Sequence, residues 1–198
     1  DTADAFTAQN IVTSPPQTLS EVARATGTTF ILALFVTLSG KPCAKLVPIE
    51  AVEQLQDDGV GFAGYAAGHM GQEPKDSDLV AVPDVSSFTP IPFVKPGLAI
   101  VHCDPHVEGK PWPYAPRVIL KGTLKKASDL GLSVNVGAEI EYFLVHRTGD
   151  GALTTADTAD VSRQPCYDAR DVTRMYDHLT EVSAAMNTLG WGNYANDH

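Results

Sequence analysis

The most informative pattern of apolar and polar residues lies in residues 134–147, VNVGAEIEYFLVHR. In a β-strand, successive side chains point to opposite faces, so residues two apart share one face. Both faces of this segment would be largely apolar, which predicts a strand covered on both sides. Glu139 and Glu141 would then lie on one face, about 7 Å apart. Two carboxylates in such a setting resist desolvation unless a cation compensates them.

Two interpretations of this glutamate pair stay open from spacing alone. In a hairpin with one solvated face, both carboxylates would simply lie in water. In a strand covered on both sides, a divalent cation bound through carboxylate oxygens is the simplest compensation.

The first half of the chain predicts a small α+β unit. Thr18 can cap a short helix whose apolar face includes Leu19 and Ala23, and Gly27 would end it. Apolar, β-rich runs predict strands, and a turn or two of helix is expected at 50–56. The expected strands cover 29–37, 42–48, 78–84 and 98–103, with at most an edge segment at 88–94 and the last strand ending at Asp104-Pro105.

The second half predicts two helices around the strand at 134–147. Pro116 suits the first position of a helix whose apolar stripe is Ile119, Leu120, Leu124, Ala127 and Leu130, with Gly131 as its end. Residues 147–160 are turn-rich and indicate a hairpin tip or a flap. Asp168 can cap a long helix that continues through Leu189, with an apolar stripe expected to face a core.

Two other segments carry candidate chemistry. The glycine-dense residues 59–72, GVGFAGYAAGHMGQ, lack a phosphate-binding motif, so they indicate either a plain surface loop or a loop that covers a ligand. His102 and His106 flank Asp104, which indicates either a metal cluster or structural residues at the end of a strand. The proline-rich segment 106–116 is the expected boundary between two domains.

Composition narrows the class of protein. The net charge of −10, without a cluster of basic residues, argues against nucleic acid as a partner. No apolar run is long enough for a membrane span, and no secretion signal is visible. Three distant cysteines predict reduced thiols and a cytoplasmic protein.

Taken together, these segments resemble the N-terminal portion of the glutamine synthetase family. The G-x-E-x-E-[FY]-F-L pattern in GAEIEYFLV is the specific part of the resemblance, and GFAGYA with GKPWPYAPR is most similar to bacterial type III enzymes and γ-glutamylmethylamide synthetases. The other segments that carry the resemblance are FILALFVTLSGKPCAKLVP, DLVAVPD, YAPRVILKGTL and QPCYDARD…WGNYANDH.

The resemblance implies an α+β fold in which an arm (1–17) precedes a β-grasp domain (18–112) and the start of a catalytic α/β domain (113–198). It implies an ATP-dependent glutamate–amine ligase that uses two or three Mg²⁺ or Mn²⁺ ions and works as a ring-shaped homo-oligomer such as a dodecamer. By the motif match, Glu141 would bind the metal nearer glutamate, and Glu139 the metal that bridges the nucleotide phosphates.

The resemblance also assigns the glycine loop, through Phe62, Ala63 and Gly64, to the amine site of a neighbouring subunit. Ammonia-using members carry an aspartate after this phenylalanine, where the chain has Ala63. A carboxylate there favours ammonium and can accept its proton, whereas alanine leaves room for an alkyl group. A small alkylamine such as methylamine is therefore one expected substrate, although another carboxylate could replace the aspartate.

Family enzymes are more than twice as long, and two glutamates do not complete a metal site. We therefore expect a fragment or a degenerate copy that is inactive alone. A non-catalytic protein that binds or regulates longer partners is the alternative from another class, and an unrelated α+β binding module is a third.

Overall fold

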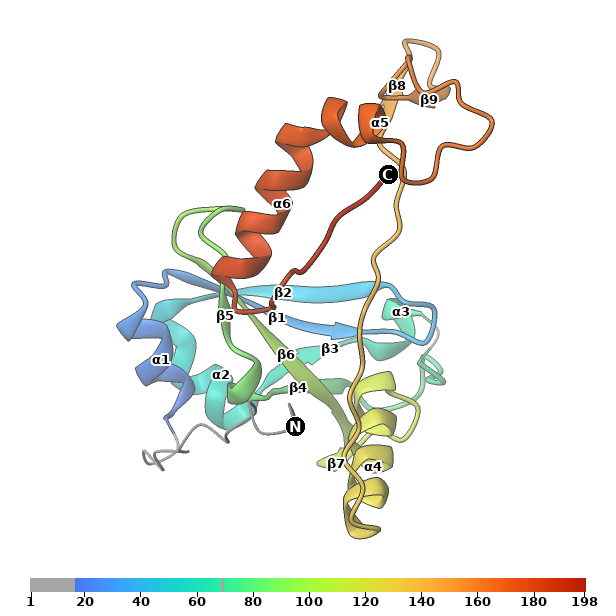
Figure 1. Ribbon diagram of the computed structural model, residues 1–198. Coiled ribbons are helices and arrows are strands. Elements are labelled where there is room, and N and C mark those ends of the chain that lie inside the picture. Colours follow the sequence, from blue (N-terminus) through green and yellow to red (C-terminus); the bar gives the residue numbers. More distant parts are fainter. Residues whose placement is uncertain (1–16, 69) are drawn as a thin grey trace. The chain divides into compact units, whose positions relative to one another are not determined.

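The computed structural model describes residues 17–68 and 70–198, which divide into two compact units (Figure 1). The first unit ends at Val134, and the second covers Asn135–His198. The expected N-terminal arm lies outside the described residues, apart from Gln17. The fold is a mixture of helices and β-sheet, as the hydrophobic patterns predict.

A mixed β-sheet forms the centre of the first unit. Its main strands lie in the order β2 (Pro42–Pro48), β1 (Phe30–Val36), β6 (Leu98–Val107), β4 (Leu79–Pro83) and β3 (Val60–Phe62). Strands β1 and β6 are parallel, and the other neighbours in this order are antiparallel. The short strands β5 (Thr89–Pro90) and β7 (Lys110–Pro111) also pair with β6.

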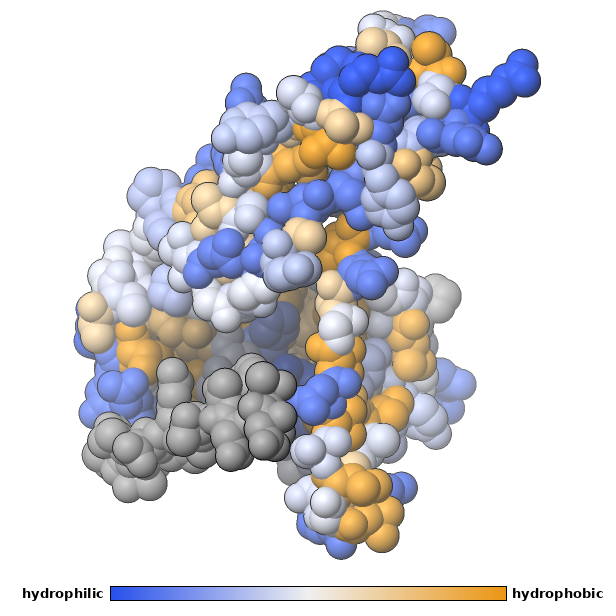
Figure 2. All heavy atoms as spheres, in the orientation of Figure 1, coloured by the Kyte–Doolittle hydropathy of each residue, from blue (hydrophilic) through white to orange (hydrophobic). Residues whose placement is uncertain are grey.

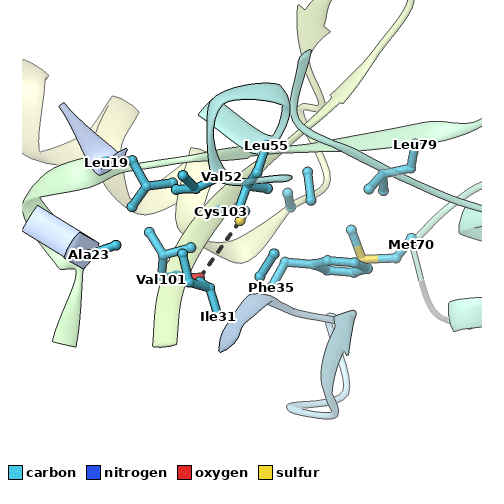
Figure 3. Close-up of a cluster of buried hydrophobic side chains, with 13 residues drawn as sticks. Leu19, Ala23, Ile31, Phe35, Val52, Leu55, Met70, Leu79, Val101 and Cys103 are labelled. Carbon is cyan, nitrogen blue, oxygen red and sulfur yellow. Dashed lines mark hydrogen bonds between the residues drawn. The ribbon is translucent and has the colours of Figure 1, made fainter. Parts of the chain in front are cut away.

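Two helices, α1 (Leu19–Ala25) and α2 (Val52–Asp58), cover one face of this sheet. Thr18 begins α1 with a capping box, in which its side chain accepts from the Glu21 amide and the Glu21 carboxylate accepts from the Thr18 amide. Figure 3 shows their apolar side chains meeting those of the strands. The buried cluster includes Leu19, Ala23, Ile31, Phe35, Val52, Leu55, Met70, Leu79, Val101 and Cys103. The remaining short helices of the first unit are η1 (Ile49–Ala51), α3 (Gly64–Ala67) and η2 (Val85–Ser87).

Strand β6 is longer than the sequence predicts. It continues through Asp104-Pro105 to Val107, where an end at that dipeptide was expected. The two halves of β6 have different neighbours, with β1 and β5 beside the first half and β4 and β7 beside the second. Pro105 is fully buried in this second half, and its carbonyl oxygen accepts from the Trp112 amide at 2.7 Å. Pairing with β4 and β7 keeps this half of β6 in a strand, although Pro105 has no backbone amide to donate.

Helix α4 (Pro116–Asp129) has the predicted bounds, and Pro116 lies in its first turn. Its predicted apolar stripe does not face the core of the first unit. Ile119, Leu120 and Leu124 are 48%, 56% and 40% exposed. Figure 2 shows a patch of apolar surface at the bottom of the view, around the end of this helix. The helix contacts the sheet through half-buried Val118, which packs against the core, and through two basic residues described below.

The second unit departs most from the expected pattern. Of the strand predicted at 134–147, only Val145–Arg147 forms one, β8, which pairs with β9 (Leu153–Thr155) in the predicted hairpin. Residues 134–144 form neither helix nor strand, because no neighbouring strand among the described residues pairs with them. Phe143 is 90% exposed as a result, so the predicted strand with two covered faces is wrong over this stretch.

The predicted C-terminal helix is divided in two. Asp168 caps α5 (Ala169–Arg174) by accepting from the Arg170 amide, and α6 follows as Tyr176–Thr188. The backbone of Met175 has φ −89° and ψ 9°, which departs from helical dihedrals and separates the two helices. The stripe expected to face a core is only half-buried, and Tyr176 is 62% exposed.

Candidate functional site

The glycine-dense segment begins in the sheet and contains more regular structure than the expected loop. Phe62 ends β3 and meets Phe35 of β1 edge to face, with ring centroids 5.0 Å apart. The Lys45 ammonium lies 5.1 Å from the centre of the Phe62 ring, within range of a cation–π interaction. The first residue of the predicted amine loop is therefore held in place by two neighbours from different strands.

Ala63 is exposed and precedes the single turn of helix α3, for which it provides no side-chain cap. Gly64 is buried at the start of this turn. A Cβ on Gly64 would overlap Oε1 of Gln72, so the glutamine amide occupies the space that a side chain would need. The Gln72 amide nitrogen donates to the Ser77 carbonyl at 2.8 Å.

The far end of the same segment is anchored to the residues that precede α4. The Trp112 indole donates to the Met70 carbonyl at 2.6 Å, and Met70 is almost fully buried. Gly71 has φ +74° and packs against the Tyr114 ring, which meets Trp112 edge to face. A positive φ suits glycine, so this residue allows the chain to turn beside the ring.

A shallow hollow of about 380 Å³ lies between β2 and the glycine-dense segment. Its lining residues are Lys41, Pro42, Cys43, Ala44, Lys45, Phe62, Ala63, Ala66 and Ala67. Two of them are basic, and none carries a carboxylate. Among the described residues that line the hollow, none could supply the carboxylate that the resemblance led us to expect beside the amine.

Glu139 and Glu141 are both exposed within the unassigned stretch of the second unit. Throughout the described ranges, no group of three or more histidine, cysteine or acidic residues is arranged to hold a metal ion. The same stretch is attached to α6 through Tyr142, whose hydroxyl lies 2.8 Å from His178 Nε2. Within the described part of the chain, no third ligand accompanies the glutamate pair, and the pair's metal role stays a prediction.

An ionic network that the sequence analysis missed joins the sheet to α4. Arg117 and Lys121, one turn apart on α4, both contact Asp84, at 2.5 and 2.8 Å, and both contact Asp104 of β6, at 3.0 and 2.5 Å. The spacing of the two basic residues is visible in the sequence. Their partners come from distant segments that only the fold brings together.

The network shifts the pKa of Asp84 and that of the neighbouring His102. Partial burial raises the pKa of Asp84, but hydrogen bonds from Lys121, Ser86 and Arg117 outweigh it and hold this pKa well below its usual range. Partial burial and the nearby Arg117 guanidinium lower the pKa of His102, against the attraction of Asp84. Asp104 thus has basic partners, and the cluster of His102, Asp104 and His106 is not a metal site among the described residues.

Comparisons with known proteins agree with the resemblance noted in the sequence. The family described as "Glutamine synthetase, catalytic domain" matches residues 113–196. A glutamine synthetase of Rhizobium leguminosarum bv. phaseoli is 39% identical over 180 residues, which cover 91% of this chain and 40% of the relative. The chain belongs to the glutamine synthetase family.

Two further comparisons extend the set of similar proteins. A glutamate–methylamine ligase of Methyloversatilis universalis is 37% identical over 170 residues, covering 85% of this chain and 38% of the relative. A solved structure of GmaS without ligand has a TM-score of 0.77 and 36% identity, covering 91% of this chain and 42% of the other. The chain thus spans about 40% of the length of the relatives it matches.

Proposed function

We propose that this chain is part of an ATP-dependent glutamate–amine ligase of the glutamine synthetase type. In this reaction the γ-carboxylate of glutamate attacks the γ-phosphorus of ATP, and ADP leaves. The amine nitrogen then attacks the γ-carbonyl carbon of γ-glutamyl phosphate, phosphate leaves, and the nitrogen loses a proton. The observation that carries the proposal is 37–39% identity, over most of the chain, to both a glutamine synthetase and a glutamate–methylamine ligase.

We further propose that the first unit contains a β-grasp domain and that the protein assembles as a homo-oligomeric ring. The strand order β2-β1-β6-β4-β3, with its parallel central pair, supports the β-grasp assignment. In such a ring, the glycine-dense segment would face the active site of a neighbouring subunit. Because Phe62, Ala63 and Gly64 belong to a well-anchored segment of the first unit, they suit a role in an adjacent site.

For the metal ions, the proposal assigns Glu141 to the ion nearer glutamate and Glu139 to the ion that bridges the nucleotide phosphates. Carboxylate oxygens suit Mg²⁺ and Mn²⁺ alike. When bound, such ions neutralise phosphate charge and polarise the group that is transferred. Two exposed carboxylates fit this donor chemistry, and further ligands would have to come from other residues.

Substitution of either glutamate tests the metal assignment. Glu139→Gln and Glu141→Gln remove one charge each without changing size, so each should raise the Mn²⁺ dissociation constant roughly tenfold. The dissociation constant is measured on the protein at its native length by electron paramagnetic resonance, which detects free Mn²⁺. The control is Glu181→Gln, an exposed glutamate of α6 in the same unit. Equal affinity in all three variants would contradict the assignment.

The amine substrate is the sharpest test of the proposed function. We propose that Ala63 favours a small alkylamine over ammonium, and the absence of a carboxylate among the residues lining the adjacent hollow supports this. Phosphate release is measured with glutamate, ATP and either methylamine or ammonium, in the protein at its native length. Methylamine should be preferred, and Ala63→Asp should shift the ratio of kcat/KM values toward ammonium roughly tenfold.

Ala63→Asn is the matched control, because asparagine has the size of aspartate without its charge. It should weaken methylamine use without improving ammonium use. A wild-type preference for ammonium would contradict the alkylamine proposal. If glutamate and ATP support no phosphate release with either amine, the alternative of a non-catalytic interaction protein replaces the ligase.

A further inference from the structure

The single helical turn α3 follows the predicted amine-site residue and has little support of its own. A helix this short is unstable in isolation, because its first turn restricts several residues for one hydrogen bond. Ala63 precedes it without a capping side chain, where serine, threonine or aspartate would supply an acceptor. The amides of Ala66 and Ala67 donate to the Ala63 carbonyl, and the Gly68 amide donates to the Tyr65 carbonyl. Something outside the turn must hold it.

Gln72 provides this support from the other end of the glycine-dense segment. Its side chain fills the space beside Gly64, where a Cβ would overlap Oε1 and come within 2.6 Å of Cδ. Its amide nitrogen donates to the Ser77 carbonyl, just before β4. Ser77 in turn donates from its hydroxyl to Glu108 at 3.1 Å, in the turn after β6. Gln72 thus connects α3 to the residues that precede β4 and follow β6.

The presence of glycine at position 64 is explained by packing and not by backbone conformation. Gly64 lies in the first turn of α3, and its φ is not in the left-handed region that only glycine adopts easily. Alanine would be favoured there by helix propensity. A Cβ at this position would require the Gln72 side chain to move, so Gly64 and Gln72 form one packing pair.

We propose that Gln72 is a positioning residue, which fixes Gly64 and thereby sets where Ala63 lies in the amine site. This inference rests on the proposed function of the loop. Gln72 itself does not line the hollow beside Ala63, so it acts through the loop and not on the amine. A glycine-rich segment without this connection would sample many backbone conformations, and ordering it would weaken amine use.

The test is a double-mutant cycle in the protein at its native length. Gln72→Ala should raise the KM for the amine roughly three- to tenfold and change the KM for glutamate less than about twofold. Gly64→Ala should have a similar effect, because its Cβ displaces the Gln72 amide. The double variant should have the same KM for the amine as Gln72→Ala alone. Truncation of Gln72 opens the space for the methyl group added at position 64, so the two effects should not add.

Gln56→Ala is the matched control, because it truncates a glutamine of α2 whose side chain bonds to Ser20 and Asp57, and it should leave both KM values unchanged. Additive effects of the two loop substitutions, or parallel changes in the KM values of glutamate and amine, would overturn the inference. Amide hydrogen exchange of residues 64–68 should accelerate in Gln72→Ala and stay unchanged in Gln56→Ala.

Hydrogen exchange separates the two proposals. A wild-type protein without amine-dependent phosphate release would refute the proposed function, while faster exchange in Gln72→Ala would still show that Gln72 holds the loop. Unchanged exchange in an active enzyme would refute the inference and leave the proposed function intact.

Discussion

Cys103 lies in the core of the first unit with no exposed surface, and its burial raises the pKa of its thiol to about 12. Cys43 is half-buried on β2, and Cys166 is exposed in the second unit. All three are free thiols, as their spacing predicts. The sequence could not rank their reactivity, because access and thiolate fraction depend on what packs around each sulfur.

This difference predicts the order in which the cysteines react with an aromatic disulfide reagent at pH 8. Cys166 should react first, because it is exposed, and Cys103 only after unfolding. Absorbance of the released thiolate measures the rate, and Cys166→Ser should remove the fastest phase. Rapid reaction of all three thiols in the native protein would contradict the buried position of Cys103.

At the scale of elements, α4 illustrates how periodicity and placement differ. The sequence predicts its bounds and its apolar stripe, and the bounds are correct. The stripe is exposed, while Arg117 and Lys121 turn toward Asp84 and Asp104. A 3.6-residue period identifies a helix and its apolar face, but not which face the neighbouring sheet covers.

The ionic network should make the first unit sensitive to acid. Because the pKa of Asp84 is lower in the folded protein, its ionisation stabilises the fold above the unfolded pKa of about 3.9. This contribution is lost as the pH falls below that value toward the folded pKa. Asp84→Asn should therefore lower the free energy of unfolding at pH 7 by about 1–2 kcal/mol, since Lys121 is partly exposed.

Urea unfolding between about pH 2 and pH 7 measures this dependence, and Asp84→Asn should flatten its acid limb. Asp129→Asn is the control, because Asp129 pairs with Lys125 on the exposed side of the same helix. Its effect should stay below about 0.5 kcal/mol. An equal loss in the two variants would show that the network adds no more than a surface pair.

At the scale of the whole molecule, the two compact units differ in how well their chains are buried. The first has a closed core between its sheet and two helices. In the second, Asp171 is the one residue of α5 and α6 that is buried, and apolar residues such as Val136 and Ile140 are 85% and 69% exposed. None of the helices in the described part of the chain has the length and apolar character to cross a bilayer.

Limited proteolysis should distinguish the units. Chymotrypsin should cut first within residues 132–144, where Tyr142 and Phe143 are exposed and outside any helix or strand. Phe35, which is 2% exposed in β1, should stay protected. Mass spectrometry of the early fragments checks this. Early cleavage within β1 would contradict a stable first unit.

The sequence by itself determined the local elements and the family. Capping at Thr18, the proline at the start of α4 and the strand-forming runs of β1 and β2 depend on near neighbours, so they were predictable. The G-x-E-x-E pattern predicted the family that the comparisons support. The metal role of Glu139 and Glu141 stays a prediction.

Only the tertiary structure decided which segments meet. The ionic network of Asp84, Arg117 and Lys121 joins residues far apart in the chain, and the length of β6 depends on its neighbouring strands. Alternation also could not show that 134–144 lacks a pairing partner among the described residues, because a strand exists only when another backbone satisfies its hydrogen bonds. Local pattern sets what a segment can become, and long-range contacts decide what it does.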